Sequence, residues 1–294
     1  MQQALFIDQL TVIGVGLIGG SLARALKERG LCGRVTGCGR NRANLERALR
    51  MGVIDVIEQD VSNAVKGADL VVIAVPLGAM PALLRQIDNA LATGAIVTDV
   101  GSAKNSVVAQ ARENLGRALA AFVPGHPIAG SEQSGVEASR ADLFAGRCTI
   151  LTPVEETARE AVDKVCGLWE GVGAMVSEMS PQEHDKVLAA TSHLPHILAY
   201  ALMHTLMHSE DREKIFRYSA GGFRDFTRIA SSDPVMWRDI CLANRDALLA
   251  MLEKFDLDLE RISALIREGD DEEMLKFFSC AKEARDHFIV KEGR

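Results

Sequence analysis

The chain has 294 residues, of which 48% are hydrophobic and 5% aromatic, and its formal net charge is −7 at pH 7. This length predicts one large or two ordinary domains with a sizeable core. The acidic balance argues against nucleic acid or an anionic membrane as the main partner. A small anionic substrate stays compatible with it, because a few local cations suffice to bind one.

The sequence carries no signal for export or membrane insertion. Its first residues lack a basic segment, and Asp8 interrupts their short apolar stretch, so we expect no signal peptide. The longest apolar run, Leu70 to Met80, contains Pro76 and is too short to span a bilayer. The six cysteines are scattered without a C-x-x-C pair, which is typical of reduced thiols in a cytoplasmic protein.

Residues 1–178 alternate strand-like apolar runs with helical patterns. Candidate strands are Leu10–Gly14, Arg34–Gly39, Leu70–Val75, Ala95–Asp99, Phe122–Gly125, Cys148–Thr152 and Ala174–Glu178. Candidate helices include Asn41–Arg50, Gly78–Leu91, Lys104–Leu115 and Glu155–Val172. This alternation predicts an α/β fold, a Rossmann-type doubly wound and mainly parallel sheet.

The pattern changes near Ser180-Pro181, after which only helical periodicities remain. The expected helices are Val187–Met207, Asp233–Phe255, Leu257–Arg267 and Glu272–Phe288, with a kink at Pro195. The sequence therefore predicts a dinucleotide-binding domain over residues 1–178 and an all-α domain over residues 179–294. Apolar stripes on residues 194–202 and 242–252 exceed what so small a helical domain can bury alone, which favours a homodimer formed through it.

The glycine motif Gly14-x-Gly16-x-x-Gly19 lies between the first strand and a helical pattern that includes Ile18. In a dinucleotide-binding unit, such glycines provide a tight turn, close approach to the pyrophosphate and close helix–strand packing. The alternative is a glycine turn that only packs a helix on a sheet. The candidate cofactor contacts near this motif and after the Leu70 strand are Gly14, Gly16, Leu17, Ile18, Gly19, Val75 and Pro76.

The end of the second strand bears on the choice of cofactor. NAD-binding units place a carboxylate about 20 residues past the glycines, where it binds the ribose hydroxyls. This chain has Gly39 there, with Arg40 and Arg42 beside it. Since arginine binds a phosphate through two parallel hydrogen bonds, the sequence favours NADP. The alternative is that both arginines are solvated at a helix start and NAD is used.

Two polar residues follow predicted strands at the edge where open α/β sheets bind ligands. Ser102 follows the Ala95 strand, and it is either an active-site residue or only the cap of the next helix. His126 lies on a rigid segment between Gly125 and Pro127, where an imidazole can accept a proton near neutral pH. A structural histidine is the alternative.

The helical half contains further candidates. His193 and His196 lie three apart beside Pro195, and His204 and His208 are four apart, but without neighbouring cysteines we predict no metal site. Arg228 follows a Gly-Gly-Phe-Arg-Asp-Phe-Thr segment, and it either binds a substrate carboxylate or forms a surface ion pair.

These motifs together resemble the prephenate/arogenate (cyclohexadienyl) dehydrogenase family of tyrosine biosynthesis. The matching segments are Gly14–Ser21, Asp99–Lys104, Gly125–Gly130, Ser192–His196 and Gly221–Arg228. They occur in the family's order and span nearly the whole chain. The first is shared with many dehydrogenases, whereas the His-Pro-Ile-Ala-Gly, Ser-His-Leu-Pro-His and Gly-Phe-Arg-Asp-Phe-Thr-Arg segments are far more specific.

The resemblance implies the oxidative decarboxylation of prephenate, arogenate or both, with hydride transfer to NAD(P)⁺. His126 matches the histidine that accepts a hydrogen bond from the C4 hydroxyl of this small anionic substrate, and Ser102 matches the serine that orients it. Arg228 matches the arginine that binds a substrate carboxylate. Other residues that match the substrate pocket are Glu132, His193, His196, Gly221, Asp225 and Trp237. The resemblance also implies a dimer formed through the helical domain.

Two other functions remain open from the sequence. A 3-hydroxyacid or imine dehydrogenase shares the plan of a sheet followed by helices, and a non-catalytic dinucleotide-sensing module needs only the nucleotide-binding half. The joint presence of Ser102, His126 and Arg228 favours catalysis. The sequence does not distinguish a pyruvyl from an alanyl side chain on the substrate.

Overall fold

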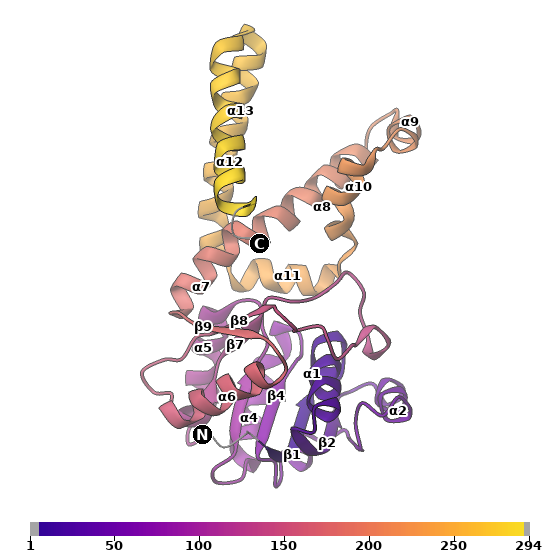
Figure 1. Cartoon of the computed structure of the whole chain (residues 1–294), viewed down its shortest axis with the longest axis vertical. Helices are drawn as coiled ribbons and strands as arrows, with labels where there is room; N and C mark the ends of the chain where they lie inside the picture. The colour runs from indigo at the N-terminus through magenta and orange to yellow at the C-terminus, as the bar shows by residue number, and fades with distance from the viewer. Residues whose placement is uncertain (1–5, 291–294) are drawn as a thin grey trace. The chain divides into compact units, whose positions relative to one another are not determined.

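The computed structural model describes residues 6–290 and divides after Arg245 into two compact units, which we describe separately (Figure 1). The first unit contains both sheets and the helices up to α11. The second contains α12 and α13.

A six-stranded parallel sheet forms the centre of the first unit, in the order β3-β2-β1-β4-β5-β6. Its strands are β1 (Ile7–Ile13), β2 (Cys32–Cys38), β3 (Val56–Glu58), β4 (Leu70–Ile73), β5 (Ile96–Asp99) and β6 (Phe122–Val123). This order confirms the predicted doubly wound sheet, and the order reverses between β1 and β4, where such sheets bind ligands. The sequence did not predict β3, because its three residues are too short for a periodic pattern.

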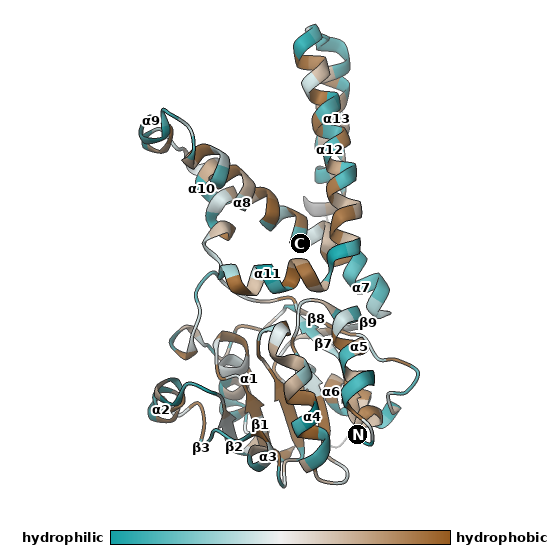
Figure 2. Cartoon of the chain, turned by 180° about the vertical axis from the view of Figure 1, so that it is seen from behind, coloured by the Kyte–Doolittle hydropathy of each residue, from teal (hydrophilic) through white to brown (hydrophobic). Residues whose placement is uncertain are grey.

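Helices cover both faces of this sheet. Helices α1 (Leu17–Glu28), α2 (Arg42–Arg50) and α6 (Arg159–Gly171) belong to one core, and α3 (Val61–Ala64), α4 (Met80–Ala90) and α5 (Lys104–Asn114) belong to the other. Leu70 and Val72 of β4 contribute to the first core, and Val71 and Ile73 to the second. Strand β4 is accordingly hydrophobic along its whole length (Figure 2), as a buried parallel strand is.

The last strands of the predicted sheet form a separate, smaller sheet. It contains β7 (Gly125–Pro127), β8 (Cys148–Leu151) and β9 (Met175–Glu178), with β7 antiparallel to β8 and β8 parallel to β9. The single strand predicted over residues 122–125 is therefore wrong, since the chain leaves the large sheet at Pro124. Proline has no N–H to donate to a ladder, but the Pro124 carbonyl accepts from Thr152 N at 2.9 Å, which starts the new sheet.

The first unit ends in helices. These are α7 (Pro181–Leu188), α8 (Leu194–Met207), α9 (Arg212–Arg217), α10 (Gly221–Thr227) and α11 (Pro234–Ala243). The helix expected from Val187 begins earlier, because the Ser180 hydroxyl caps α7 by accepting from Glu183 N. A π-helical turn over residues 189–193 precedes Pro195, which interrupts the regular hydrogen-bond ladder in place of a simple kink.

The second unit is a pair of neighbouring helices, α12 (Arg245–Glu268) and α13 (Asp271–Arg285), joined at Gly269 (Figure 1). Arg261 of α12 pairs with Glu273 of α13 at 3.7 Å. Two separate helices had been expected over residues 233–255 and 257–267, but the break occurs at Asn244. Asn244 is buried, and its side-chain amide binds Asp185 O and His193 at this break.

The remaining helical segments are short. They are the 3₁₀ turns Leu77–Ala79, Leu119–Ala121, Val136–Ala138 and Arg228–Ser231, and a π-helical turn at Asp286–Val290. Within residues 6–290, no helix combines the length and the apolarity that a membrane span requires.

Candidate active site

The glycine motif lies at the topological switch point, between the carboxyl ends of β1 and β4. Gly14 has a φ of +95°, and a Cβ there would collide with the carbonyl oxygen of Ala74. A Cβ at Gly19 would collide with the Gly14 oxygen, whereas a Cβ at Gly16 would meet nothing within 4 Å. Gly14 and Gly19 therefore serve the turn and the helix packing, and Gly16 leaves open space for a ligand.

This open space lies at a helix N-terminus, which suits an anionic group. Gly16 is the N-cap of α1, which begins at Leu17 and Ile18, and no side chain caps it. The first N–H groups of such a helix stay available for a phosphate. Val75 and Pro76 follow β4 directly, and Val75 Cγ1 lies 2.9 Å from the position that a Cβ on Gly14 would occupy. The structure thus fits a dinucleotide pyrophosphate at this turn.

The end of β2 is also open. A Cβ added at Gly39 would meet only Leu45 Cδ2, at 3.8 Å. Arg40 is exposed, and the exposed Arg42 pairs with Glu46 at 3.0 Å on α2. The end of β2 therefore has space for a ribose phosphate, and the guanidinium groups of Arg40 and Arg42 lie beside it.

A cavity of about 330 Å³ brings together most of the predicted substrate residues. His126 and Glu132 come from β7 and the loop after it, and His196, Arg228 and Trp237 come from the helical segments. Its other lining residues are Pro127, Ile128, Ala129, Gly130, Ser131, Leu188, Ser192, Ile229, Ser232 and Met236. The cavity therefore lies between the small sheet and the helices of the first unit.

Arg228 and Glu132 face one another across this cavity. The Arg228 guanidinium Nη1 donates to Glu132 Oε2 at 2.8 Å, and 58% of the Arg228 side chain is exposed. A hydrogen bond from its own backbone N–H, followed by that from Arg228, lowers the pKa of Glu132. An exposed ion pair contributes little to stability, so Arg228 is free to exchange this carboxylate for another.

The wall of the cavity is aromatic. The His196 ring stacks on Trp237 with centroids 3.8 Å apart, and His193 meets the same indole edge-on at 6.0 Å. His196 Nδ1 donates to Ser192 O at 2.9 Å. Burial lowers the pKa of His196, which favours the neutral ring with Nε2 as an acceptor.

His126 is held by a partner that the sequence did not suggest. Its Nδ1 lies 2.9 Å from His184 Nε2, and His184 Nδ1 lies 2.8 Å from Asp185 Oδ1. Burial, followed by the nearby His184, Lys104 and His193, lowers the pKa of His126 well below its usual range. The only sign of this arrangement in the sequence is the adjacent pair His184-Asp185 on a helix.

Asp185 also joins α7 to the start of α5. Its two carboxylate oxygens accept from Lys104 N at 2.7 Å and Asn105 N at 2.9 Å. Asp185 therefore caps the first N–H groups of α5 from another helix. The N-cap position of α5 is Ala103, so the alternative that Ser102 acts only as the cap of this helix is wrong.

A buried ion pair lies behind His126. Lys104 Nζ is 2.6 Å from Asp99 Oδ2 and 2.6 Å from Gly125 O, and both charged side chains are fully buried. Burial lowers the pKa of Lys104, and Asp99 opposes this effect. The ammonium group thus fixes the backbone immediately before His126.

Four predicted residues do not line the cavity. Ser102 is half-buried and does not hold His126 Nδ1, which belongs to His184. His193 is buried behind Trp237 with its Nδ1 facing Asn244 Nδ2 at 3.0 Å, and burial lowers its pKa to about 4. Gly221 and Asp225 are exposed on α10.

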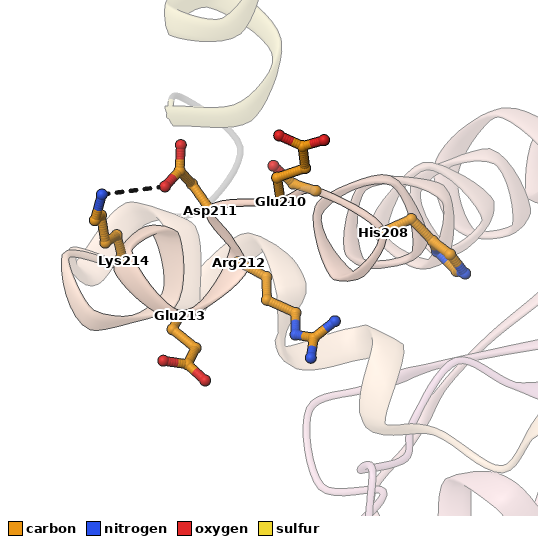
Figure 3. Close-up of a pocket in the computed structure, with 7 residues that line it drawn as sticks. His208, Glu210, Asp211, Arg212, Glu213 and Lys214 are labelled. Atoms are coloured by element: carbon orange, nitrogen blue, oxygen red, sulfur yellow. Dashed lines mark hydrogen bonds and ion pairs between the residues drawn. The ribbon is translucent and has the colours of Figure 1, made fainter.

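A second recess, of about 430 Å³, lacks the features of a site. It is lined only by the consecutive residues 208–214 between α8 and α9 (Figure 3), where Lys214 pairs with Asp211 at 3.2 Å. The rings of His204 and His208 lie 4.4 Å apart nearby. The described residues contain no group of three His, Cys, Asp or Glu side chains that could hold a metal ion.

Comparisons with known proteins identify the family. Two family models match consecutive parts of the chain, "Prephenate dehydrogenase, nucleotide-binding domain" over residues 22–178 and "Prephenate dehydrogenase, dimerization domain" over residues 180–280. The prephenate dehydrogenase of Bacillus subtilis (strain 168) is 40% identical, over 97% of this chain and 77% of that protein. The cyclohexadienyl dehydrogenase of Zymomonas mobilis is 39% identical, over 94% of both.

A solved structure extends this similarity to three dimensions. The crystal structure of prephenate dehydrogenase from A. aeolicus, in complex with hydroxyphenyl propionate and NAD⁺, matches with a TM-score of 0.89 at 37% identity. The match covers 96% of this chain and 99% of that one. The chain therefore belongs to the prephenate dehydrogenase family of NAD(P)-dependent oxidoreductases.

Proposed function

We propose that this protein oxidises and decarboxylates prephenate, arogenate or both, to 4-hydroxyphenylpyruvate or tyrosine, in tyrosine biosynthesis. The observation that carries the proposal is the shared cavity of His126 and Arg228. One is an imidazole whose Nε2 forms no hydrogen bond with the described residues, and the other is an exchangeable guanidinium. A C4 hydroxyl and a carboxylate on one small ring require this pair of groups.

Each residue has a separate task in this reaction. Arg228 binds the side-chain carboxylate of the substrate, and the stacked His196 and Trp237 form the wall against the ring. His126 Nε2 accepts the proton of the C4 hydroxyl while hydride leaves C4, and the C1 carboxylate departs as CO₂. When bound, NAD(P)⁺ supplies the acceptor for the hydride. The electron pair of the broken C1–carboxylate bond moves through the ring to the C4 oxygen, which takes back the proton from His126, so the ring becomes aromatic. The hydride carries away the only two electrons that are lost.

The remaining site residues keep supporting roles in this proposal. Glu132 holds Arg228 until substrate binds, and His193 supports Trp237 from behind. We assign Ser102 to the nicotinamide side and Gly221 and Asp225 to substrate binding from the resemblance alone, because none of the three lines the cavity. The cofactor contacts are the glycine turn, Leu17, Ile18, Val75, Pro76 and the end of β2.

We infer that the cofactor is preferentially NADP⁺, with NAD⁺ as the alternative. The open space at Gly39 and the adjacent Arg40 and Arg42 support this preference. We further propose a cytoplasmic homodimer, with a nucleotide-binding domain over residues 1–178 and a helical dimerization domain over residues 179–294. The family model for the second region, described as a dimerization domain, supports this assembly.

One assay tests the activity and the cofactor preference. Purified protein is mixed with NADP⁺ or NAD⁺ and with prephenate, arogenate or a 3-hydroxyacid, and the absorbance of the reduced cofactor is followed. We expect turnover of prephenate or arogenate, no turnover of the 3-hydroxyacid, and a higher kcat/KM with NADP⁺. A tenfold preference for NAD⁺ would overturn the cofactor proposal, and turnover of only the 3-hydroxyacid would overturn the function. The variant Gly39→Asp tests the same proposal from the other direction. Its carboxylate repels a ribose phosphate, so it should shift the cofactor preference toward NAD⁺.

A further inference from the structure

We propose that His184 and Asp185 are positioning residues that fix the tautomer of His126, so that its Nε2 always presents a lone pair to the substrate hydroxyl. The proposal rests on the proposed role of His126 as the base. It assigns to His184 the orienting role that the resemblance implies for Ser102. The three groups lie in series, with separations of 2.9 Å from His126 to His184 and 2.8 Å from His184 to Asp185.

The direction of these hydrogen bonds follows from Asp185. Its oxygens accept from two backbone N–H groups of α5, so both face donors. Burial alone raises its pKa, but the hydrogen bonds from His184, Lys104 and Asn105 leave that pKa below its usual value. An ionised carboxylate only accepts hydrogen bonds. His184 must therefore carry a proton on Nδ1.

The same logic carries over from His184 to His126. Burial lowers the pKa of His184, so its ring is neutral and holds a single proton. Since that proton is on Nδ1, the Nε2 of His184 is an acceptor. His126 must then place its own proton on Nδ1 to complete the 2.9 Å hydrogen bond. This leaves His126 Nε2 without a proton, as a base requires.

The arrangement stabilises the reaction at its charged stage. When His126 accepts the hydroxyl proton it becomes an imidazolium, and its hydrogen bond to His184 becomes charge-assisted and stronger. His184 and Asp185 are almost fully buried, with 0% and 1% exposure, so water does not replace these contacts. An interaction that strengthens only as charge develops raises kcat rather than substrate affinity. Burial, followed by His184, Lys104 and His193, disfavours the charged ring and lowers the pKa of His126. The hydrogen bond that a neutral His184 accepts from His126 Nδ1 offsets part of this cost.

Two substitutions at His184 separate positioning from packing. His184→Gln keeps an amide oxygen where the ring had Nε2, so it still accepts from His126, whereas His184→Leu keeps the bulk without an acceptor. We expect kcat to fall by about 10²-fold in His184→Leu and by about tenfold or less in His184→Gln, by analogy with other positioned bases. KM for the substrate should stay within about threefold in both variants, because Arg228 is untouched. His208→Gln and His208→Leu, on the exposed end of α8, are the matched controls and should behave as the unsubstituted protein.

Two independent measurements test the proposal: the kinetics of the His184 variants, and spectra that do not require turnover. Equal loss of kcat in the two His184 variants, or a kcat within twofold of the unsubstituted protein in His184→Leu, overturns it. Long-range ¹H–¹⁵N spectra of histidine-labelled protein report the tautomer directly, with the His126 signal identified by its loss in His126→Asn. A proton on Nδ1 of His126 supports the proposal and a proton on Nε2 overturns it. If the unsubstituted protein turns over neither prephenate nor arogenate, the proposed function fails, and these spectra still test the tautomer.

Discussion

Substitution of His126 should affect the chemical step much more than substrate binding. We expect His126→Asn to lower kcat by about 10²–10⁴-fold, the usual contribution of a positioned acid–base group. KM for the substrate should change much less, because the Arg228 contact remains. Steady-state kinetics measure both constants, and thermal melting checks the fold. A folded His126→Asn protein with unimpaired kcat would show that His126 is not the base.

Arg228 should show the opposite pattern. Arg228→Gln removes the guanidinium that we assign to the substrate carboxylate, so KM for the substrate should rise at least about tenfold, or about 1.4 kcal/mol. The Kd of the cofactor, measured by fluorescence titration, should not change. Arg112→Gln is the matched control, because Arg112 also pairs with a glutamate, Glu156, outside the cavity. An unchanged KM would mean that Arg228 is only an ion-pair residue.

Site residues that lie in a distinctive local sequence can be predicted from the sequence. Site residues whose role depends on tertiary contacts cannot. The segments around His126, Ser192 and Gly221 carry specific local sequences, so the sequence alone pointed to them. His184 has no such signal. Its importance comes from the folding of α7 against β7 and α5, which places it between His126 and Asp185.

The glycine turn between β1 and α1 is the element whose parts can be tested independently. Gly16→Ala should leave thermal stability unchanged, because a Cβ there meets nothing within 4 Å, yet raise the Kd of the cofactor. Gly14→Ala should lower the melting temperature by several degrees, because its φ of +95° disfavours a side chain and Ala74 O blocks the Cβ. Calorimetry and cofactor titration measure the two effects. Equal melting temperatures for the two variants would contradict this division of roles.

Helices and strands with a strong hydrophobic pattern can be predicted from the sequence. Element boundaries that coincide with tertiary contacts cannot. The apolar runs of β4 and β5 predict buried parallel strands, which the structure confirms. The break at Asn244 was missed because the helical period continues through it. The Asn244 side chain binds Asp185 O at this break, a tertiary contact that a local pattern cannot predict.

The stability of the whole molecule should depend on pH through its buried histidines. The pKa values of His126, His184 and His193 are lowered in the folded protein, so unfolding lets each of them bind a proton more readily. This stabilisation is fully present above the unfolded value of about 6.5, and is lost as the pH falls toward the folded pKa, about 4 for His193. Each neutral histidine should contribute a slope of about 1.4 kcal/mol per pH unit in that window.

Urea unfolding at pH 7.5, 6, 5 and 4.5 measures this dependence. The slope of the unfolding free energy against pH should be smaller in His193→Asn, which lacks one of the titrating groups. A stability that does not change between pH 7 and pH 5 would contradict the neutral, buried state of these rings.

Assembly is the other property of the whole molecule. Large apolar side chains are exposed on the helical segments, and they include Met207, Tyr218, Phe226, Leu242, Leu257, Ile266, Leu275 and Phe278. We expect the protein to sediment as a dimer at micromolar concentration. Phe278→Asp should raise the dimer Kd at least about tenfold, since burial of such a side chain contributes about 1.5–3 kcal/mol. Leu49→Asp, on α2, is the matched control and should remain dimeric. A fully active monomer would contradict the proposed dimer.

Between the two sheets, Pro124 is the only residue that separates β6 from β7. Side chains alternate between the faces of a strand, so inserting or deleting one residue there would invert β7. His126 pairs in register with Ile150, and it would turn to the opposite side of its sheet. Changes of length in the loop from Ala129 to Arg147 leave that register intact. Related chains should therefore keep an invariant length across residues 122–127 while their lengths vary beyond it.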